Sequence, residues 1–176
     1  MQIISGLYKN SPLKSPNDEK THPMGSREKL ALFNMLNGQI EGKTVLDVFA
    51  GSGALGLEAL SRGAKSVVFV EKSPKIAQTL RKNIAAVTRG QSSATSVVIA
   101  DATKFQSVEK FDLIFADPPY DLYSEALLSP LVKFLAKSAI LCVSLPKTAP
   151  SPVLEGLVAI TRRNYASASL IIFQKP

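Results

Sequence analysis

VLDVFAGSGALGLEAL, residues 45–60, is the stretch of this sequence that decides its fold. An apolar run ends in Asp47-Val48-Phe49, a turn follows through Ala50-Gly51-Ser52-Gly53, and helix-forming residues come next. Glycines allow such a tight turn and let a ligand approach the backbone closely. We therefore predict a strand, a cofactor-binding loop and a helix, with the binding residues Asp47, Phe49, Ala50, Gly51, Ser52 and Gly53.

Around this stretch, strand-like and helix-like segments alternate along the chain. The strand-like segments are continuously apolar, which is typical of a parallel sheet with helices on both faces. The last two strand-like segments, joined by a short polar link, predict an antiparallel hairpin at the sheet edge. We expect strands over residues 44–49, 66–71, 94–100, 111–116 and 139–145, the hairpin over 156–165 and 167–174, and helices over 26–37, 53–61, 74–87 and 123–136.

Residues 1–24 have a different composition, rich in Lys, Ser, Asn and Pro and poor in helix formers. We expect a short β-hairpin there, followed by an extended basic arm, and an α/β core over residues 25–176. Because no composition change divides the rest of the chain, we expect one domain over residues 1–176.

Composition limits the function further. The formal net charge of +7 favours a polyanionic partner, although a solvated basic surface would give the same charge. With one cysteine and one histidine, the chain has no internal disulfide and no zinc-type cluster, and we expect no metal. No apolar run approaches the roughly 20 residues of a membrane helix, and the first residues do not resemble a signal peptide. We therefore expect a cytoplasmic protein.

Three acidic residues lie at the ends of three successive predicted strands. Asp47 lies just before the glycine turn, Glu71 ends the second strand, and Asp101 follows the third. A carboxylate at the position of Glu71 can accept hydrogen bonds from both hydroxyls of a ribose. Asp101 can accept from an adenine amino group, or it can simply cap the following turn. Together these residues predict a nucleoside site at one edge of the sheet.

The glycines alone leave the ligand open. Gly51, Gly53 and Gly56 satisfy the GxGxxG pattern, which also serves NAD and FAD. Asp47 beside the turn would be unfavourable near a pyrophosphate, but it suits an amino acid that carries an ammonium and a sulfonium. This favours S-adenosylmethionine, and an ordinary strand-to-helix turn with a capping aspartate is the alternative.

Asp117-Pro118-Pro119-Tyr120 follows the fourth predicted strand. The lone pair of an exocyclic base amine is delocalised into the ring, so its methylation needs acceptors that bind the amine hydrogens. The Asp117 carboxylate and the Pro118 carbonyl can accept, and the prolines fix the direction of the chain. Tyr120 can stack on the base. We predict that Asp117, Pro118 and Tyr120 are catalytic, with a rigid turn as the alternative.

At these motifs the chain resembles the bacterial 16S ribosomal RNA guanine-N2 methyltransferase D family, within the class I Rossmann-like methyltransferases. The resemblance covers nearly the whole chain. The matching segments are IISGLYKNSPLKSP (the family's basic hairpin), HPMGSREKLALFNML (its first helix), VLDVFAGSGALGLEALSRGA (its cofactor loop) and DPPY (its catalytic motif). Many DNA and RNA amine methyltransferases share the last two motifs, so the N-terminal segment and the size favour this family.

The resemblance implies a role for each matching position. Asp47 and the loop 50–53 would hold the methionine part of the cofactor, and Glu71 its ribose. Asp101 and Ala102 would hold the adenine, while Asp117, Pro118 and Tyr120 would hold the target guanine. Two departures concern the substrate contacts: the family's Arg-Pro-Thr is His22-Pro23-Met24 here, and Gly25 and Ser26 replace polar residues ahead of a matching Arg27.

A basic cluster near the N-terminus predicts the RNA contact. Lys9, Lys14 and Arg27 are the predicted substrate-binding residues, and Lys20 and Lys29 belong to the same cluster. A solubilising flexible arm is the alternative. We expect 16S ribosomal RNA or the small ribosomal subunit as the partner, and a monomer.

Four alternative functions differ from this one in features that can be checked. A DNA adenine-N6 or cytosine-N4 methyltransferase uses a similar tetrapeptide, but usually carries a target-recognition region for which this chain has little room. A protein glutamine methyltransferase has asparagine where Asp117 stands. A nucleotide-binding oxidoreductase would give the tetrapeptide no role, and a non-catalytic RNA-binding relative would fail to bind the cofactor.

Overall fold

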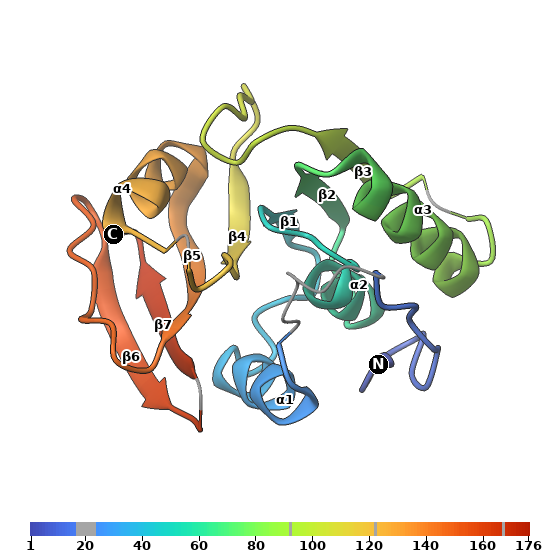
Figure 1. Ribbon diagram of the computed structural model, residues 1–176, viewed down its shortest axis with the longest axis horizontal. Coiled ribbons are helices and arrows are strands. Elements are labelled where there is room, and N and C mark those ends of the chain that lie inside the picture. Colours follow the sequence, from blue (N-terminus) through green and yellow to red (C-terminus); the bar gives the residue numbers. More distant parts are fainter. Residues whose placement is uncertain (17–23, 92, 122, 167) are drawn as a thin grey trace.

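The computed structural model describes residues 1–16, 24–91, 93–121, 123–166 and 168–176. Within them the chain forms a seven-stranded sheet with the strand order β3-β2-β1-β4-β5-β7-β6 (Figure 1). Every predicted strand is present. The strands are β1 (Thr44–Asp47), β2 (Ser66–Glu71), β3 (Thr95–Ile99), β4 (Phe111–Ala116), β5 (Leu135–Pro146), β6 (Val158–Asn164) and β7 (Ala168–Gln174).

The order of the strands reverses at β1. This strand pairs in parallel with β2 on one side and with β4 on the other, so the chain moves outward to β3 and then returns. Ligands of open α/β sheets bind at such a reversal, beyond the carboxyl ends of the strands. Asp47 ends β1 and Asp117 directly follows β4, so both predicted functional acids lie at this point.

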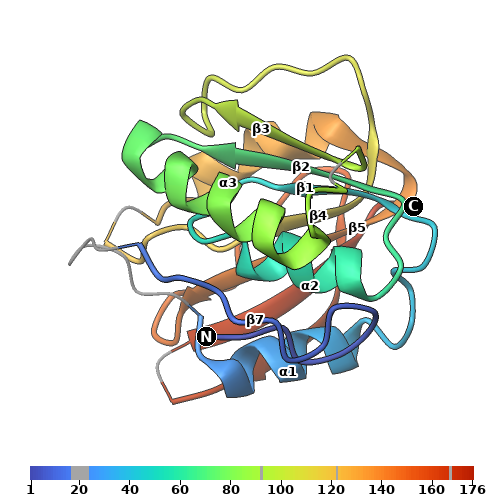
Figure 2. The same ribbon diagram turned by 90° about the vertical axis from the view of Figure 1, so that its right-hand side faces the viewer.

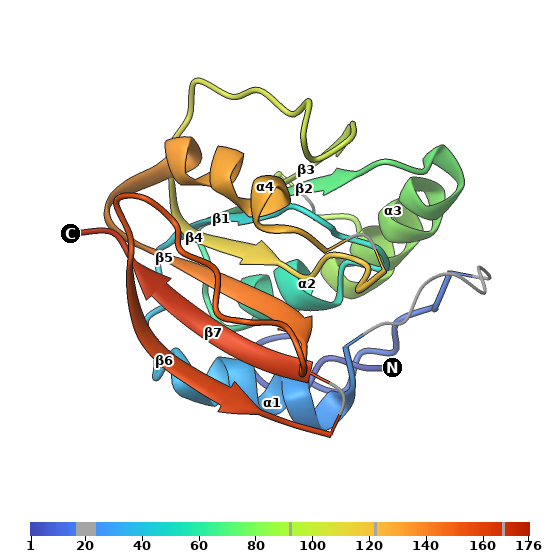
Figure 3. The ribbon, with the colours of Figure 1, turned by 60° about the vertical axis from the view of Figure 1, so that its left-hand side comes forward.

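The C-terminal hairpin is also confirmed. β7 pairs antiparallel with β5, and β6 pairs antiparallel with β7, so β6 is the edge strand (Figure 3). The hairpin turn follows Asn164 and lies beside Pro146, because Ala168 pairs with Pro146. The turn between β6 and β7 is therefore at the same edge of the sheet as the carboxyl end of β5.

Helices cover the two faces unequally. One face carries α1 (Ser26–Met35), α2 (Ala54–Ser61) and α3 (Pro74–Thr88), and the other carries α4 (Glu125–Leu128) and the 3-10 helix η1 (Ser129–Phe134) (Figure 1). Because strand side chains alternate between faces, Val45 packs with the first group and Leu46 with the second. Among the described residues, no helix is long and apolar enough to cross a bilayer.

The single helix predicted over residues 123–136 is wrong. The α-helix ends at Leu128 and a 3-10 helix follows, with Pro130 in its first turn. Proline has no N–H to donate and its ring clashes with the carbonyl four residues earlier, so the α-helix cannot continue through Pro130. The strand β5 then begins at Leu135, inside the predicted helix.

Residues 1–16 confirm the predicted N-terminal hairpin, but they are packed against the core. Gln2 and Pro12 form a bridge, and Ile3 donates a backbone hydrogen bond to Ser11. Ile3 is fully buried and Leu13 is nearly so, and the segment lies along α2 and α3 (Figure 2). The rest of the predicted arm, including Lys20, His22 and Pro23, lies at residues 17–23, outside the described part of the chain.

Candidate cofactor and target site

Asp47 is a buried carboxylate at the reversal of strand order. It is 1% exposed, and its Oδ2 accepts a hydrogen bond from the backbone N–H of Gly56 at 2.9 Å. Burial raises the pKa of Asp47 to about 7; the bond from Gly56 opposes this rise, and the charges of Asp117 and Glu71 add to it. A positively charged ligand group beside Asp47 would therefore be favoured.

Residues Ala50–Gly53 are here called the cofactor loop. Its two glycines are required for different reasons. Gly51 (φ 52°) and Gly53 (φ 83°) both have left-handed backbones. A Cβ at Gly53 would lie 2.4 Å from Cδ1 of Leu80, so this glycine lets α3 pack closely. A Cβ at Gly51 would have no neighbour nearer than the Phe49 carbonyl oxygen at 4.0 Å. Gly51 therefore leaves its backbone open on the side where a ligand could approach.

Glu71 joins two loops at the carboxyl edge. Its Oε2 accepts from the backbone N–H of Gly51 at 2.9 Å, and its Oε1 accepts from the N–H of Ser73 at 2.8 Å. Each carboxylate oxygen has a second lone pair, so Glu71 can still accept from hydroxyl groups of a ligand. Glu71 thus orients the cofactor loop and remains a candidate ribose ligand.

Asp101 is occupied by its own surroundings. Its Oδ1 accepts from the backbone N–H and the hydroxyl of Thr103, and its Oδ2 lies 2.7 Å from Nζ of Lys72. These contacts, led by the hydrogen bond with Lys72, lower the pKa of Asp101. The turn-capping alternative is therefore realised in this structure. The neighbouring Ala102 is buried against the apolar core beneath.

The residues Asp117–Tyr120, here called the catalytic tetrapeptide, follow β4. Burial raises the pKa of the Asp117 carboxyl to about 6, and a hydrogen bond with the hydroxyl of Ser144 opposes that rise. The Ser144 oxygen also lies 2.8 Å from the phenol oxygen of Tyr120. A serine hydroxyl has one proton, so when it donates to Asp117, Tyr120 donates to Ser144. Ser144 in this way links the side chains of Asp117 and Tyr120, and Pro118 is buried.

The other residues predicted to bind the cofactor, Phe49, Ala50 and Ser52, lie at or just before the cofactor loop. Phe49 is partly buried against the core under α4, and Ala50 and Ser52 are nearly fully buried. The loop is therefore a packed element whose backbone, more than its side chains, is available to a ligand.

The predicted substrate-binding residues are exposed, but the structure does not gather them. Lys14 lies beside α3, and Arg27 lies in the first turn of α1. Lys9 lies near Ser61 at the end of α2, because the adjacent Tyr8 donates its N–H to Ser61 Oγ at 2.9 Å. Since α2 starts at the carboxyl edge and runs away from it, Lys9 lies at the far end of that helix.

Lys29 was placed with the basic RNA-binding cluster, and this prediction is wrong. The side chain is buried, with its Nζ 3.2 Å from Glu58 Oε2 and 2.8 Å from the Gln2 carbonyl oxygen. Glu58 is fully buried and also accepts from the backbone N–H groups of Ile4 and Ser5. Lys29 and Glu58 therefore fasten the N-terminal hairpin between α1 and α2.

Three connecting residues were missed from the sequence: Ser144, Glu58 and Asn83. The Asn83 side chain accepts from the Lys14 N–H and donates to the Lys14 and Ser52 carbonyls, each at 2.9 Å. It thereby ties the hairpin to the cofactor loop. A polar residue on an amphipathic helix gives no signal of such a role, because its partners lie 31 and 69 positions away in the chain.

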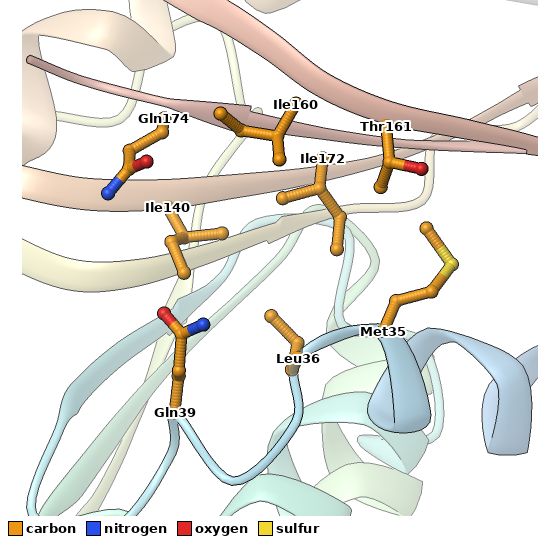
Figure 4. Close-up of a pocket in the computed structure, with 8 residues that line it drawn as sticks. All are labelled: Met35, Leu36, Gln39, Ile140, Ile160, Thr161, Ile172 and Gln174. Atoms are coloured by element: carbon orange, nitrogen blue, oxygen red, sulfur yellow. The ribbon is translucent and has the colours of Figure 1, made fainter.

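A hollow between α1 and the C-terminal strands lies apart from these residues (Figure 4). It contains no ionisable side chain, so it offers nothing to the charged groups of the predicted cofactor. Its lining residues are Met35, Leu36, Gln39, Ile140, Ile160, Thr161, Ile172 and Gln174.

Comparison with known proteins agrees with this geometry. Residues 1–174 match the protein family described as Conserved hypothetical protein 95. Ribosomal RNA small subunit methyltransferase D of Haemophilus influenzae is 33% identical over 181 residues, covering 99% of this chain and 93% of that protein. The protein of the same name from Escherichia coli is 37% identical over 122 residues, covering 68% of this chain and 60% of that protein.

Solved structures agree over the whole fold. The structure of YhhF from Escherichia coli is 29% identical with a TM-score of 0.87, covering 99% of this chain and 97% of that one. The structure of HI0767 from Haemophilus influenzae is 31% identical with a TM-score of 0.80, covering 99% and 98%. The predicted class I methyltransferase fold is therefore confirmed, and the chain belongs to the ribosomal RNA small subunit methyltransferase D family.

Proposed function

We propose that this protein transfers a methyl group from S-adenosylmethionine to the exocyclic N2 amine of a guanine in 16S ribosomal RNA. The observation that carries the proposal is the meeting of Asp47, the cofactor loop and the catalytic tetrapeptide where the strand order reverses between β1 and β4. The names of the relatives supply the substrate class, and the tetrapeptide supplies the chemistry.

The residues present fit the cofactor. Asp47 is buried, and the ion pairs of the described residues use Glu58 and Asp101 instead, so Asp47 is available to an ammonium group. Glu71 has acceptor capacity for the ribose hydroxyls, and Gly51 leaves room for close approach. Asp101 and Ala102 lie at the end of the next strand, where adenine would be held. S-adenosylmethionine supplies a methyl group on a positively charged sulfur, which leaves with the electrons of the broken C–S bond.

Asp117 and Pro118 orient the amine. With a pKa of about 6, Asp117 is mostly ionised at neutral pH and accepts from one amine hydrogen, while the Pro118 carbonyl accepts from the other. The nitrogen lone pair is then directed at the methyl carbon and forms the N–C bond. The surplus proton leaves the cationic nitrogen for Asp117 or water. Alignment of the reacting atoms contributes more to the rate acceleration than the basicity of Asp117 does.

Tyr120 and Ser144 position the target base relative to the Asp117 carboxylate. The ring of Tyr120 is partly exposed and free to stack on a base, while its hydroxyl is held by Ser144. The Ser144 hydroxyl also supports the negative charge of Asp117. One buried hydroxyl therefore fixes the distance between the stacking ring and the accepting carboxylate.

The experiment that tests this function offers labelled S-adenosylmethionine with three substrates: small ribosomal subunits, naked 16S ribosomal RNA and duplex DNA. We expect label in a ribosomal substrate, and the ratio of the first two shows whether assembly is required. Label in DNA alone would establish the alternative, a DNA adenine-N6 or cytosine-N4 methyltransferase. Absence of label together with absence of cofactor binding would contradict an enzymatic role.

A further inference from the structure

The outer face of α3 carries a stripe of positive charge. Lys75 and Lys82 are spaced by seven residues, or two helical turns, so they lie along one side of the helix about 10 Å apart. Arg89, the C-cap residue directly after the helix, adds a third cation at its end. All three are exposed, and the helix Pro74–Thr88 contains no acidic residue. This stripe is separate from the basic residues of the N-terminal segment in the sequence.

The charges of the stripe are available to a partner. In the described part of the chain the three ion pairs engage Lys29, Arg62 and Lys72, and none engages the stripe. Asp101, the acid near the start of α3, is already paired with Lys72. The stripe therefore presents uncompensated charge to the solvent.

The stripe is continuous with the candidate site and with the N-terminal hairpin. The helix α3 begins three residues after Glu71, so Lys75 lies near the carboxyl edge of the sheet. Halfway along, Asn83 is hydrogen-bonded to the backbone of Lys14 in both directions, which places Lys14 against the middle of α3. Figure 2 shows the hairpin segment and α3 on the same side of the molecule, with the segment between α3 and α1.

The chemistry of this face fits a phosphate backbone. The exposed positions between the cations are Gln78, Arg81, Ala85 and Ala86, so the face lacks the aromatic and large apolar anchors on which protein interfaces depend. Regularly spaced lysines and arginines are sufficient to bind nucleic acid, because each releases a counterion from a phosphate. The charge pattern therefore favours RNA over a protein partner.

We propose that Lys75, Lys82 and Arg89, together with Lys14, bind the RNA backbone that flanks the target nucleotide. The inference rests on the proposed function, since it assumes an RNA substrate. RNA bound along α3 would extend from the carboxyl edge, where the target base is held, across the helices that cover this face. The stripe then contributes affinity that does not depend on base sequence.

The test compares two variants with three charges removed in each. The first is Lys75→Gln/Lys82→Gln/Arg89→Gln, and the matched control is Lys43→Gln/Lys65→Gln/Lys137→Gln. The control residues are exposed and lie at the amino-terminal edge of the sheet, before or near the starts of β1, β2 and β5. The measurement is kcat/KM for the ribosomal substrate that the wild-type protein methylates, between 50 and 200 mM salt, with cofactor affinity and thermal melting as checks of folding.

We expect the α3 variant to lose about 2 units from the slope of log kcat/KM against log salt, because three phosphate contacts are removed. Over that salt range the wild-type protein then loses about 16-fold more activity than the variant does. The control keeps the wild-type slope. An unchanged slope in the α3 variant, or an equal change in the control, would overturn the inference. A smaller salt slope of the α3 variant with assembled subunits, but an unchanged slope with naked RNA, would assign the face to a ribosomal protein instead. If the wild-type protein methylates no RNA, the proposed function itself fails.

Discussion

The cofactor loop and the catalytic tetrapeptide follow neighbouring strands but are held by different numbers of partners. Glu71 on β2 and Asn83 on α3 both bind the backbone of the cofactor loop. Among the described residues, the side chains of Asp117 and Tyr120 both contact Ser144 of β5. A loop that must hold a constant cofactor can be built rigidly from several sides. Under the proposed function the tetrapeptide must receive a base from a large RNA and so keep one face open, and its partly exposed tyrosine fits that requirement.

The largest expected effect separates the two loops by function. Replacing Asp117 with alanine removes an acceptor from the amine, and we expect methyl transfer to fall by on the order of 10²–10³. The cofactor affinity should stay close to that of the wild-type protein, because the Asp47 and Glu71 contacts remain. Asp121→Asn, an exposed acid beside the tetrapeptide, is the matched control. Full activity of Asp117→Ala would remove the catalytic assignment.

The next effect tests the packing of the cofactor loop. Gly53 and Gly38 have nearly the same left-handed φ, 83° and 80°, but a Cβ at Gly38 has no neighbour within 4 Å. We expect Gly38→Ala to cost about 1–2 kcal/mol of unfolding free energy from backbone strain alone. Gly53→Ala should cost about 1–3 kcal/mol more, because its Cβ meets the fully buried Leu80. Urea denaturation measures both, and equal losses would show that the loop is not tightly packed.

A smaller effect is expected at Ser144, which contacts both Asp117 and Tyr120. Ser144→Ala should lower kcat by roughly tenfold, about the loss of one hydrogen bond to a charged group, and leave cofactor affinity unchanged. The pKa of Asp117 should rise further above 6, moving the acid limb of the pH–rate profile to higher pH. Ser169→Ala, another buried serine on the adjacent strand, should leave that profile unchanged. A profile that does not move in Ser144→Ala would contradict the link between these side chains.

The smallest effect concerns stability and pH in the absence of cofactor. Burial raises the pKa of Asp47 from 3.8 to about 7, so between these values the folded state binds more protons than the unfolded state does. Stability therefore decreases as the pH rises through this window. We expect the melting temperature to be a few degrees higher at pH 5 than at pH 7.5, and the difference to shrink in Asp47→Asn. The same pH dependence in both proteins would show that Asp47 is not the source.

Much of this comparison could be predicted from the sequence. The strand ends that carry Asp47, Glu71 and Asp117 are set by continuous apolar runs and by glycine and proline signals, all of which are local. The hairpin at residues 1–16 and the C-terminal hairpin also follow from local patterns. The helix predicted over residues 123–136 instead ends at Leu128, ahead of Pro130.

The connecting residues could not be predicted, because their roles depend on distant partners. Ser144 meets Tyr120 across 24 positions, and Glu58 meets Ile4 across 54. Lys29 illustrates the reverse error: in the sequence it belongs to a basic cluster, while in the fold it is buried against Glu58. Charge along a chain predicts a surface, but only the packing of the helices decides which cations reach it.

The measurement that tests the central claim most directly is identification of the nucleoside formed from 16S ribosomal RNA by the wild-type protein. Digestion to nucleosides and mass spectrometry against synthetic standards would resolve the methylated atom. N2-methylguanosine, present with the wild-type protein and absent with Asp117→Ala, is the predicted result. A methyl group on a ring carbon, a ribose oxygen or another base, or N2-methylguanosine formed equally by both proteins, would contradict it.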